Sequence, residues 1–287
     1  MHAAIKQAKH VLTYKVAYWL GEKHGKVYFY PETPHPYTAA YKALHLSGIR
    51  VVGGLPGKAD KSPVIFIWED STFSRHPVPT VPNGAFVVNR DCRDISKSLV
   101  GQLHLEVFGY HAEIDPLSYM GEMVAKSEEN GAHSGKIVTG PLLSKEPGWT
   151  YQRVINNTSD GLALFSAGAG KAIDFRVPIF GGVRQRAYIK FRDIRSRFGN
   201  VNDLVEFVDV DTLFSRSEID KLNEFCKRIG LDYGEIDVVR DAGSNLIFVL
   251  DVNKTPLGPP NGLPQSGVEE ALSFYKESFS NFVRLRQ

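Results

Sequence analysis

The sequence has only two cysteines, no long apolar run and almost no net charge, and each of these absences excludes a class of protein. Cys92 and Cys226 lie far apart, and neither belongs to a CxxC or Cys/His pattern, which argues against a disulfide framework or a zinc site. No segment approaches the ~20 apolar residues of a membrane span. The formal net charge of +2 at pH 7 is too small to indicate a nucleic-acid-binding surface.

The first 25 residues do not resemble an export signal. There is no apolar core of signal-peptide length. The apolar positions are interrupted by the charged residues Lys6, Lys9, Lys15, Glu22 and Lys23. The pattern favours an amphipathic helix packed on the protein. A length of 287 residues, of which 43% are hydrophobic, suffices for two or three packed subdomains. We therefore expect a soluble cytoplasmic protein without membrane or nucleic-acid partners.

The front of the chain alternates between strand-like and helix-like segments. Three short β-rich or apolar runs are typical of buried strands: 26–31, 49–52 and 64–68. Between the first two, residues 35–47 carry an apolar helical face that ends at Gly48. This order of elements predicts a small open α/β layer.

From residue 86 the pattern predicts a second, α+β region. A short strand at 86–89 is followed by a helix that Asp94 could cap and that ends at Gly109. One antiparallel sheet is expected to contain 124–126, 136–138, 150–155, 172–180 and 186–191. A helix is expected at 217–229 and a last helix at 268–285. Between them, the strands 235–240 and 246–251 are expected to form a hairpin.

The hairpin carries the most informative residues. Asp251 and Asn253 end its second strand at alternate positions, so both side chains point to one face. Asp237, on the first strand, could lie on that face across an antiparallel pair. Two carboxylates and an amide oxygen suit Mg²⁺, which prefers oxygen ligands and usually shares its shell with phosphate oxygens. The alternative, solvated acids at strand ends, is common for any single aspartate.

The hairpin resembles the closing signature of the ATP-grasp superfamily. The resemblance rests on Ile236-Asp-Val and on Leu250-Asp-Val-Asn-Lys-Thr-Pro256. In that superfamily an acid on one strand, and an acid-x-Asn on the next, hold the ions that bridge the ATP phosphates. The resemblance implies ATP and Mg²⁺ as cofactors, with Asp237, Asp251 and Asn253 as metal ligands. The superfamily more often has Glu at the Asp251 position, and the shorter side chain could alter whether one or two ions bind.

Two lysines precede the hairpin in the order that the resemblance implies. Lys97 matches a lysine near the start of the central domain, and Lys126 matches one before a flexible glycine-bearing loop. Both would contact phosphates. In that loop, Asn130, Gly131 and Gly135 could bring backbone N–H groups close to anionic oxygens. Either lysine alone could equally be a solvated surface residue.

Residues 151–155 resemble the strand that lines the adenine pocket. Gln152 could bond to the adenine amino group, while the backbone around Arg153 and Val154 would contact the ring edge. The superfamily often has Glu at the Gln152 position, and a plain core strand is the alternative.

Arg176 is the candidate for stabilising charge in the transition state. Asp174-Phe-Arg176 resembles a strand whose arginine commonly faces the transferred phosphoryl group or the substrate carboxylate. Lys190 and Arg192 alternate on the next strand and could enlarge this anion site, or could form an exposed charged edge.

Two other signals fail. Gly168-Ala-Gly170-Lys171 lacks the Ser or Thr of a phosphate loop, and its spacing is wrong. His133 and Ser134 are adjacent but have no recognisable third partner, so a hydrolase triad is not supported.

The resemblance covers about residues 94–260 and implies an ATP-grasp domain at 94–287. We expect a lid-bearing central part at about 94–155 and a metal-binding C-terminal part at about 156–287. A small N-terminal open α/β domain, the pre-ATP-grasp domain, would occupy residues 1–93.

The resemblance implies an ATP-dependent carboxylate–amine ligase. Such enzymes activate a carboxylate as an acyl phosphate, which an amine or similar nucleophile captures. A small-molecule kinase on the same scaffold, or a non-catalytic nucleotide-binding protein, stays open. The loop 127–135 would close over the phosphates. Small-molecule substrates would bind front-domain residues and the loop 257–264, with candidates Tyr30, His35, Glu69, Asp70 and Arg75. Many relatives form dimers, so a homodimer is one option.

Overall fold

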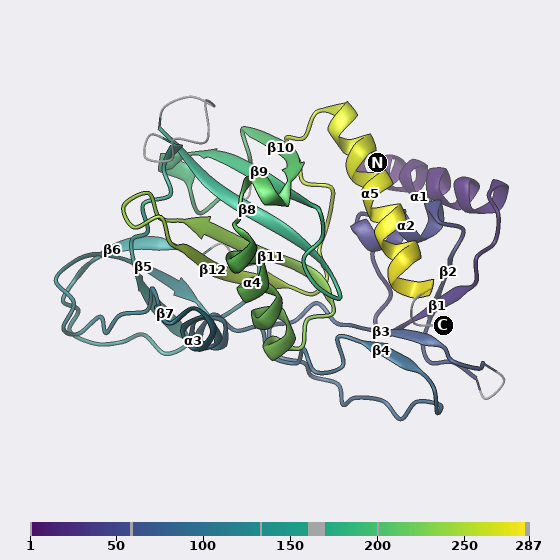
Figure 1. Cartoon of the computed structure of the whole chain (residues 1–287), viewed down its shortest axis with the longest axis horizontal. Helices are drawn as coiled ribbons and strands as arrows, with labels where there is room; N and C mark the ends of the chain where they lie inside the picture. Colours follow the sequence, from purple (N-terminus) through teal and green to yellow (C-terminus); the bar gives the residue numbers. More distant parts are fainter. Residues whose placement is uncertain (1, 58–59, 133, 160–169, 200, 285–287) are drawn as a thin grey trace.

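The computed structural model describes residues 2–57, 60–132, 134–159, 170–199 and 201–284, with side chains from residue 11 onward. In this part of the chain it holds five α-helices and three β-sheets, drawn in Figure 1. A parallel sheet at the N-terminal end is followed by a small and then a larger antiparallel sheet. This mixture agrees with the expected α/β and α+β fold class.

The first sheet is parallel throughout. Its strand order is β2 (Arg50–Gly53), β1 (Lys26–Pro31), β3 (Val64–Trp68) and β4 (Phe86–Val88). All five side chains of β3 are buried, as expected for a parallel strand covered on both faces. Helix α2 (Ala39–Leu46) starts later than the predicted residue 35, because the Thr38 side chain caps it by accepting from Tyr41 N.

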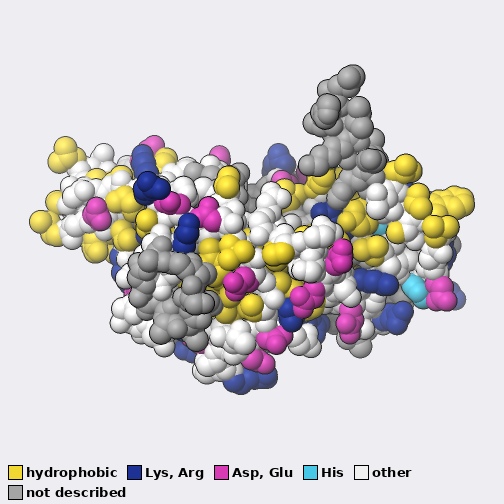
Figure 2. Space-filling model, turned by 90° about the horizontal axis from the view of Figure 1, so that it is seen from above, with side chains coloured by type: hydrophobic (Ala, Val, Ile, Leu, Met, Phe, Trp, Pro, Cys, Tyr) yellow, Lys and Arg dark blue, Asp and Glu magenta, His cyan; other side chains and the backbone are white. Residues whose placement is uncertain are grey.

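Two long helices lie beside α2 near this sheet: α1 (His2–Leu20) and α5 (Gln265–Arg284) (Figure 1). The rings of Phe279 and Phe282 on α5 contact Phe66 of β3. The expected packing of α1 is incomplete, since Trp19 and Leu20 are 82% and 84% exposed. None of the helices described is long and apolar enough to cross a membrane. On the face shown in Figure 2, basic and acidic side chains are interspersed.

The small sheet is antiparallel and follows helix α3 (Lys97–Phe108). Its strand order is β6 (Lys136–Gly140), β5 (Gly121–Ser127) and β7 (Trp149–Arg153). Asp94 is not the helix cap that we predicted. Instead Ser96 caps α3 by accepting from Leu99 N, and Asp94 accepts from Ser96 N at 2.7 Å. The helix ends at Gly109, whose φ of 86° suits glycine.

The large sheet is also antiparallel and has five strands. Their order is β10 (Leu204–Asp209), β9 (Arg186–Asp193), β8 (Lys171–Phe180), β11 (Tyr233–Arg240) and β12 (Ile247–Asn253). The prediction that β8 and β9 extend the small sheet is wrong. Residues 154–157, which follow β7, belong to no strand. After this break β8 belongs to a separate sheet with new partners. The edge strand β10 was not predicted.

One face of the large sheet packs on α3 and on α4 (Arg216–Ile229), which begins one residue before the predicted position 217 because Ser215 and Glu218 form a capping box at its start. Phe175 of β8 and Val238 of β11 lie in this core together with Phe225 of α4. Because side chains alternate along a strand, the neighbours of these core residues point to the opposite face. That opposite face carries the candidate site.

Candidate functional site

Charged side chains from neighbouring strands meet on the face of the large sheet that lies opposite α3 and α4. The strand register places Asp237 of β11 directly between Arg176 of β8 and Asp251 of β12. On the far side of β8, Asp174 is paired with Lys190 of β9. The sequence therefore brings together residues that are up to 77 positions apart (174 to 251).

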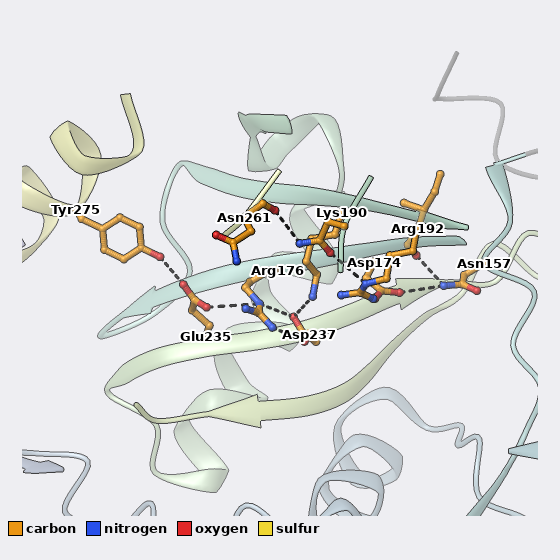
Figure 3. A network of polar contacts seen from close by, with 11 residues as sticks. Asn157, Asp174, Arg176, Lys190, Arg192, Glu235, Asp237, Asn261 and Tyr275 are labelled. Carbon is orange, nitrogen blue, oxygen red and sulfur yellow. Dashed lines mark hydrogen bonds and ion pairs between the residues drawn. The ribbon is translucent and has the colours of Figure 1, made fainter. Parts of the chain in front are cut away.

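Asp237 is the centre of this cluster, as Figure 3 shows. Arg176 donates to both of its oxygens, from Nε to Oδ1 and from Nη2 to Oδ2, each at 2.9 Å. Lys190 Nζ donates to Oδ1, also at 2.9 Å. Burial alone would raise the pKa of Asp237, but the charges and hydrogen bonds of Arg176 and Lys190 hold it well below its usual range. Asp237 is therefore a carboxylate at any physiological pH.

Lys190 is buried to the end of its side chain, which is 2% exposed. Burial, together with the charge of Arg176, lowers the pKa of Lys190. Arg192, two residues along β9, donates to Asp174, which also accepts from Asn157 at 3.1 Å. The two basic residues of β9 are thus internal partners of acids and not the exposed charged edge that the sequence left open.

Asp251 lies beside Asp237 but has few partners of its own. Its Oδ1 atom is buried and accepts no hydrogen bond from the described residues, and Lys97 Nζ lies 3.6 Å away. Burial raises the pKa of Asp251. A buried carboxylate oxygen without a partner is costly, and a bound cation would supply the missing partner.

Asn253 follows on the same strand, and its Oδ1 atom accepts from Thr255 N at 2.9 Å. Among the described residues, no group of three or more His, Cys, Asp or Glu side chains could hold a metal ion. Asp237, Asp251 and the amide of Asn253 fit Mg²⁺ only if phosphate or water oxygens complete the shell, which is common for this ion.

The two predicted phosphate-binding lysines converge on the hairpin. Lys97 is the first residue of α3, and its Nζ donates to the carbonyl of Glu129 at 3.1 Å. Lys126 on β5 donates to the carbonyl of Leu250 at 3.5 Å. Burial lowers the pKa of Lys126 to about 8, although the charge of Asp251 opposes this change.

A cavity of about 170 Å³ lies between the small and the large sheet. Its apolar wall includes Val124, Ile155, Val239, Leu250 and Phe198. Its polar wall includes Lys97, Lys126, Gln152, Arg153, Asn157, Asp174, Arg197, Asp237 and Asp251. The cavity thus joins an apolar compartment to the charged cluster.

A β-bulge in the hairpin shapes this cavity. The register shifts after Asp237, whose partner is Asp251, so that Val238 pairs with Val249 and Leu250 is an extra residue on β12. Leu250 and Asp251 are adjacent in sequence, yet both line the cavity. Strict strand alternation would have allowed only one of them to do so.

Three residues of the predicted adenine strand 151–155 line the cavity: Gln152, Arg153 and Ile155. Gln152 donates from Nε2 to Glu113 Oε1 at 2.7 Å, which leaves its carbonyl oxygen for another partner. Arg153 forms an ion pair with Asp241 at 3.3 Å and lies over the Phe248 ring. Val154 is not among the described residues that line the cavity.

The loop after β5 contacts one wall of the cavity through Gly135 and Phe198. Asn130 N donates to Thr72 Oγ1 at 2.8 Å, so this residue is turned toward the front layer. A Cβ atom on Gly135 would lie only 2.8 Å from the ring of Phe198, so the loop packs closely on a cavity wall. Gly131 has a φ of 69°. His133, and Gly168 of the rejected phosphate loop, lie outside the described residues.

Some of the expected substrate residues reach the end of the hairpin. Asp70 Oδ1 accepts from Thr255 Oγ1 at 3.1 Å. Glu69 is 1% exposed and accepts from Arg75 Nε at 3.1 Å. The loop 257–264 is held by Lys42, whose Nζ donates to the carbonyl of Gly258 at 2.6 Å.

Two further members of the charged cluster were missed. Glu235 is 1% exposed and lies 3.5 Å from Arg176 Nε, and Tyr275 donates to it (Figure 3). The sequence could have indicated Glu235, because it lies two positions from Asp237 on a strand and therefore on the same face. Nothing in the sequence indicated Tyr275, because it comes from a distant helix.

Comparisons with known proteins bear on the fold. No protein-family model matches the sequence, and the search of curated proteins finds no match. Solved structures do match, among them the ATP-grasp ligase PsnB complexed with a phosphomimetic variant of its minimal precursor, Mg and ADP. That likeness has a TM-score of 0.54 and 13% sequence identity, and it covers 92% of this chain and 99% of the other. A complex of PsnB with the precursor peptide PsnA2 and AMPPNP matches with a TM-score of 0.52 and 13% sequence identity. This likeness covers 90% of this chain and 97% of the other.

Proposed function

This chain has the ATP-grasp fold, and from the site on that fold we propose that it is a Mg-ATP-dependent ligase. It would activate a carboxylate as an acyl phosphate and pass it to an amine or a similar nucleophile. One observation carries the proposal. The buried Oδ1 atom of Asp251 accepts no hydrogen bond from the described residues and forms only a 3.6 Å ion pair with Lys97, and both residues line the cavity between the two sheets.

The metal would be held by Asp237, Asp251 and Asn253. When bound, Mg²⁺ neutralises phosphate charge during phosphoryl transfer. Asp251 is suited to it because its buried oxygen lacks a partner, and Asp237 because it is ionised at physiological pH. Lys97 and Lys126 lie next to this pair and would contact the phosphates.

The base of the nucleotide would occupy the apolar part of the cavity. Val239 and Leu250 belong to the large sheet and Val124 to the small sheet, so a flat ring could lie between them. The free carbonyl oxygen of Gln152 would accept from an amino group on that ring. The backbone near Arg153 and Val154 would contact the edge of that ring, and the loop that contains Asn130, Gly131 and Gly135 would lie over the phosphates.

Arg176 would stabilise the charge that develops on the transferred phosphoryl group. Its Nε and Nη2 atoms donate to Asp237, and the hydrogen bonds of the described residues include none from Nη1. The aspartate therefore fixes the plane of the guanidinium and leaves one nitrogen for a ligand. Lys190 would act mainly by adding positive charge beside it.

The acceptor is a carboxylate. PsnB is a ligase that was solved with its precursor peptide, so peptide carboxylates belong in a substrate screen beside small acids and amines. The products decide the reaction type. ADP, phosphate and a new amide support the ligase, whereas a phosphorylated acceptor without free phosphate would replace it by a kinase.

The first experiment measures melting temperatures with ADP or ATP, with and without Mg²⁺. A ligand at ~100 times its dissociation constant stabilises by about 2.7 kcal/mol. We expect a Mg²⁺-dependent rise in the wild type that is lost in Asp251→Ala and kept in Asp211→Ala, which alters an exposed aspartate. No rise with any nucleotide in the wild type would reject the proposed nucleotide site.

A further inference from the structure

Helix α5 reaches the charged cluster through two buried side chains. The Tyr275 hydroxyl donates to Glu235 Oε1 at 2.5 Å, and each of the two residues is only 1% exposed. The other carboxylate oxygen, Oε2, lies 3.5 Å from Nε of Arg176. Figure 3 shows these three side chains in a row, with Glu235 between the helix and the guanidinium.

Strand β11 explains why the contact occurs here. Tyr233, Glu235 and Asp237 lie at alternate positions and therefore on one face. Tyr233 packs against Phe279 of α5, with ring centroids 4.9 Å apart, whereas Asp237 belongs to the charged cluster. Glu235 stands at the border between the aromatic core and the site, where its Oε2 atom accepts no hydrogen bond from the described residues and has the Arg176 ion pair as its compensation.

A second acidic partner would help to hold Arg176, because Asp237 shares its negative charge among several cationic groups. The Oδ1 atom of Asp237 already accepts from both Arg176 and Lys190. If Asp237 also takes part in metal binding, as the proposed function requires, its negative charge is shared with a divalent ion and attracts the guanidinium less. Glu235 offers Arg176 a second carboxylate, one oxygen of which faces the guanidinium while the other accepts from Tyr275.

We infer that Glu235, oriented by Tyr275, is a positioning residue that holds the Arg176 guanidinium in place when Asp237 takes up a metal ion. The metal ion in the last clause, and any role in phosphoryl transfer, rest on the proposed function. The link from α5 through Glu235 to Arg176 exists without any ligand. It makes a helix that supplies no ligand-binding group part of the apparatus for phosphoryl transfer.

The test observes Arg176 directly, by NMR of the Nε–Hε groups in protein labelled with ¹⁵N-arginine. The Arg176 signal is assigned by its loss in Arg176→Lys. Two variants weaken the link: Tyr275→Phe removes one hydroxyl, and Glu235→Gln keeps the shape but removes the charge. Tyr233→Phe is the matched control, because it removes a neighbouring buried hydroxyl that has no hydrogen-bond partner among the described residues.

In nucleotide-free protein, we expect the Arg176 signal to shift or broaden in Tyr275→Phe and in Glu235→Gln, and to stay in place in Tyr233→Phe. An unchanged signal in Tyr275→Phe, or an equal change in the control, would overturn the inference. If Glu235→Gln fails to fold, the two Tyr→Phe variants still decide.

A second arm adds Mg²⁺ and ADP. The Arg176 signal should persist in the wild type and broaden in Glu235→Gln, and Mg²⁺ should bind about 10- to 100-fold more weakly in that variant. Equal Mg²⁺ affinity and equal signals would overturn the positioning role. If the wild type binds no Mg-ADP, the proposed function fails, while the nucleotide-free comparison still tests the link from Tyr275 to Arg176.

Discussion

Lys97 Nζ and Asp251 Oδ1 lie 3.6 Å apart, too far for a hydrogen bond and close enough for strong attraction. The two residues come from the start of α3 and the end of β12, and both line the cavity between the sheets. The buried aspartate oxygen keeps no hydrogen-bond partner within the described chain. Because both residues line the cavity, a cation could bind the aspartate and an anionic oxygen could bind the lysine from the cavity side.

The Asp251 carboxylate, whose buried Oδ1 atom accepts no hydrogen bond from the described residues, should lower the stability of the ligand-free protein. We predict that Asp251→Asn raises the free energy of unfolding without ligand by about 1 kcal/mol, because it removes an incompletely compensated buried charge. The same variant should lose the stabilisation by Mg-ADP. Urea unfolding with and without Mg-ADP measures both effects, and a variant that is less stable than the wild type without ligand would contradict the argument.

The affinity for Mg-ADP should depend on pH through Lys126. Its pKa in the ligand-free protein is about 8, because it is buried. Phosphate binding favours the protonated lysine, so the dissociation constant should rise several-fold as the pH increases from 7 to 9. Lys126→Arg keeps its charge in this range and should remove most of the dependence. Calorimetry at several pH values would measure it, and equal slopes for both proteins would contradict this role.

Protein stability in acid should depend on His104. This residue is 2% exposed, stacks on Phe108, and has its pKa lowered to about 4 by burial. The unfolded chain binds a proton near pH 6.5 and the folded chain does not, so stability is lost as the pH falls from about 6.5 to 4. His104→Phe keeps the ring stacking and should be less sensitive to acid, by up to about 3 kcal/mol at pH 4. Urea unfolding between pH 4 and 7.5 would test this, and parallel pH profiles would exclude it.

The loop after β5 should be sensitive to a single methyl group. A Cβ atom at Gly135 would meet the Phe198 ring at 2.8 Å, and ring carbons near the backbone cannot easily move away. We predict that Gly135→Ala weakens Mg-ADP binding about 10-fold by shifting the loop or the cavity wall. Phe198→Leu should relieve most of this loss in the double variant. Additive effects of the two substitutions on the dissociation constant would show that the residues do not contact each other in solution.

The cap of α4 should contribute to stability in two separable ways. Ser215→Ala removes one half of the capping box and should cost about 1 kcal/mol. Glu218→Ala removes the other half and also leaves Arg240, which is 5% exposed, without its carboxylate partner at 2.8 Å. The second substitution should therefore cost about 3 kcal/mol or more. Urea unfolding of both variants would compare them, and equal losses would mean that the Arg240 contact adds nothing.

The sequence predicted most elements because local patterns decided them. The apolar run at 64–68 became β3, and the helix expected at 217–229 became α4, which begins at Arg216 and is followed by Gly230. The edge strand at 204–209 escaped notice, because its half-buried pattern is supported mainly by pairing with β9. The division into two antiparallel sheets was also missed, since pairing partners are chosen by tertiary packing and not by local sequence.

The candidate site was predicted as a set of residues but not as a network. Asp237, Asp251 and the two lysines do converge, as their order along the chain suggested. The sequence could not show that Arg176 grips Asp237 with two hydrogen bonds, because that contact depends on the pairing of β8 with β11. Tyr275 was beyond reach for the same reason, since it approaches from a helix after the hairpin.

The extra residue in β12 limits which sequence changes this hairpin can accept during evolution. Loss of Leu250 would restore regular alternation, and the cavity would then gain either an apolar contact or a carboxylate from this part of the strand, but not both. A point substitution here changes the contacts of one side chain. A change of length instead shifts the pairing of every later residue in the strand. We therefore expect descendants of this chain to vary the chemistry of the hairpin while preserving its length.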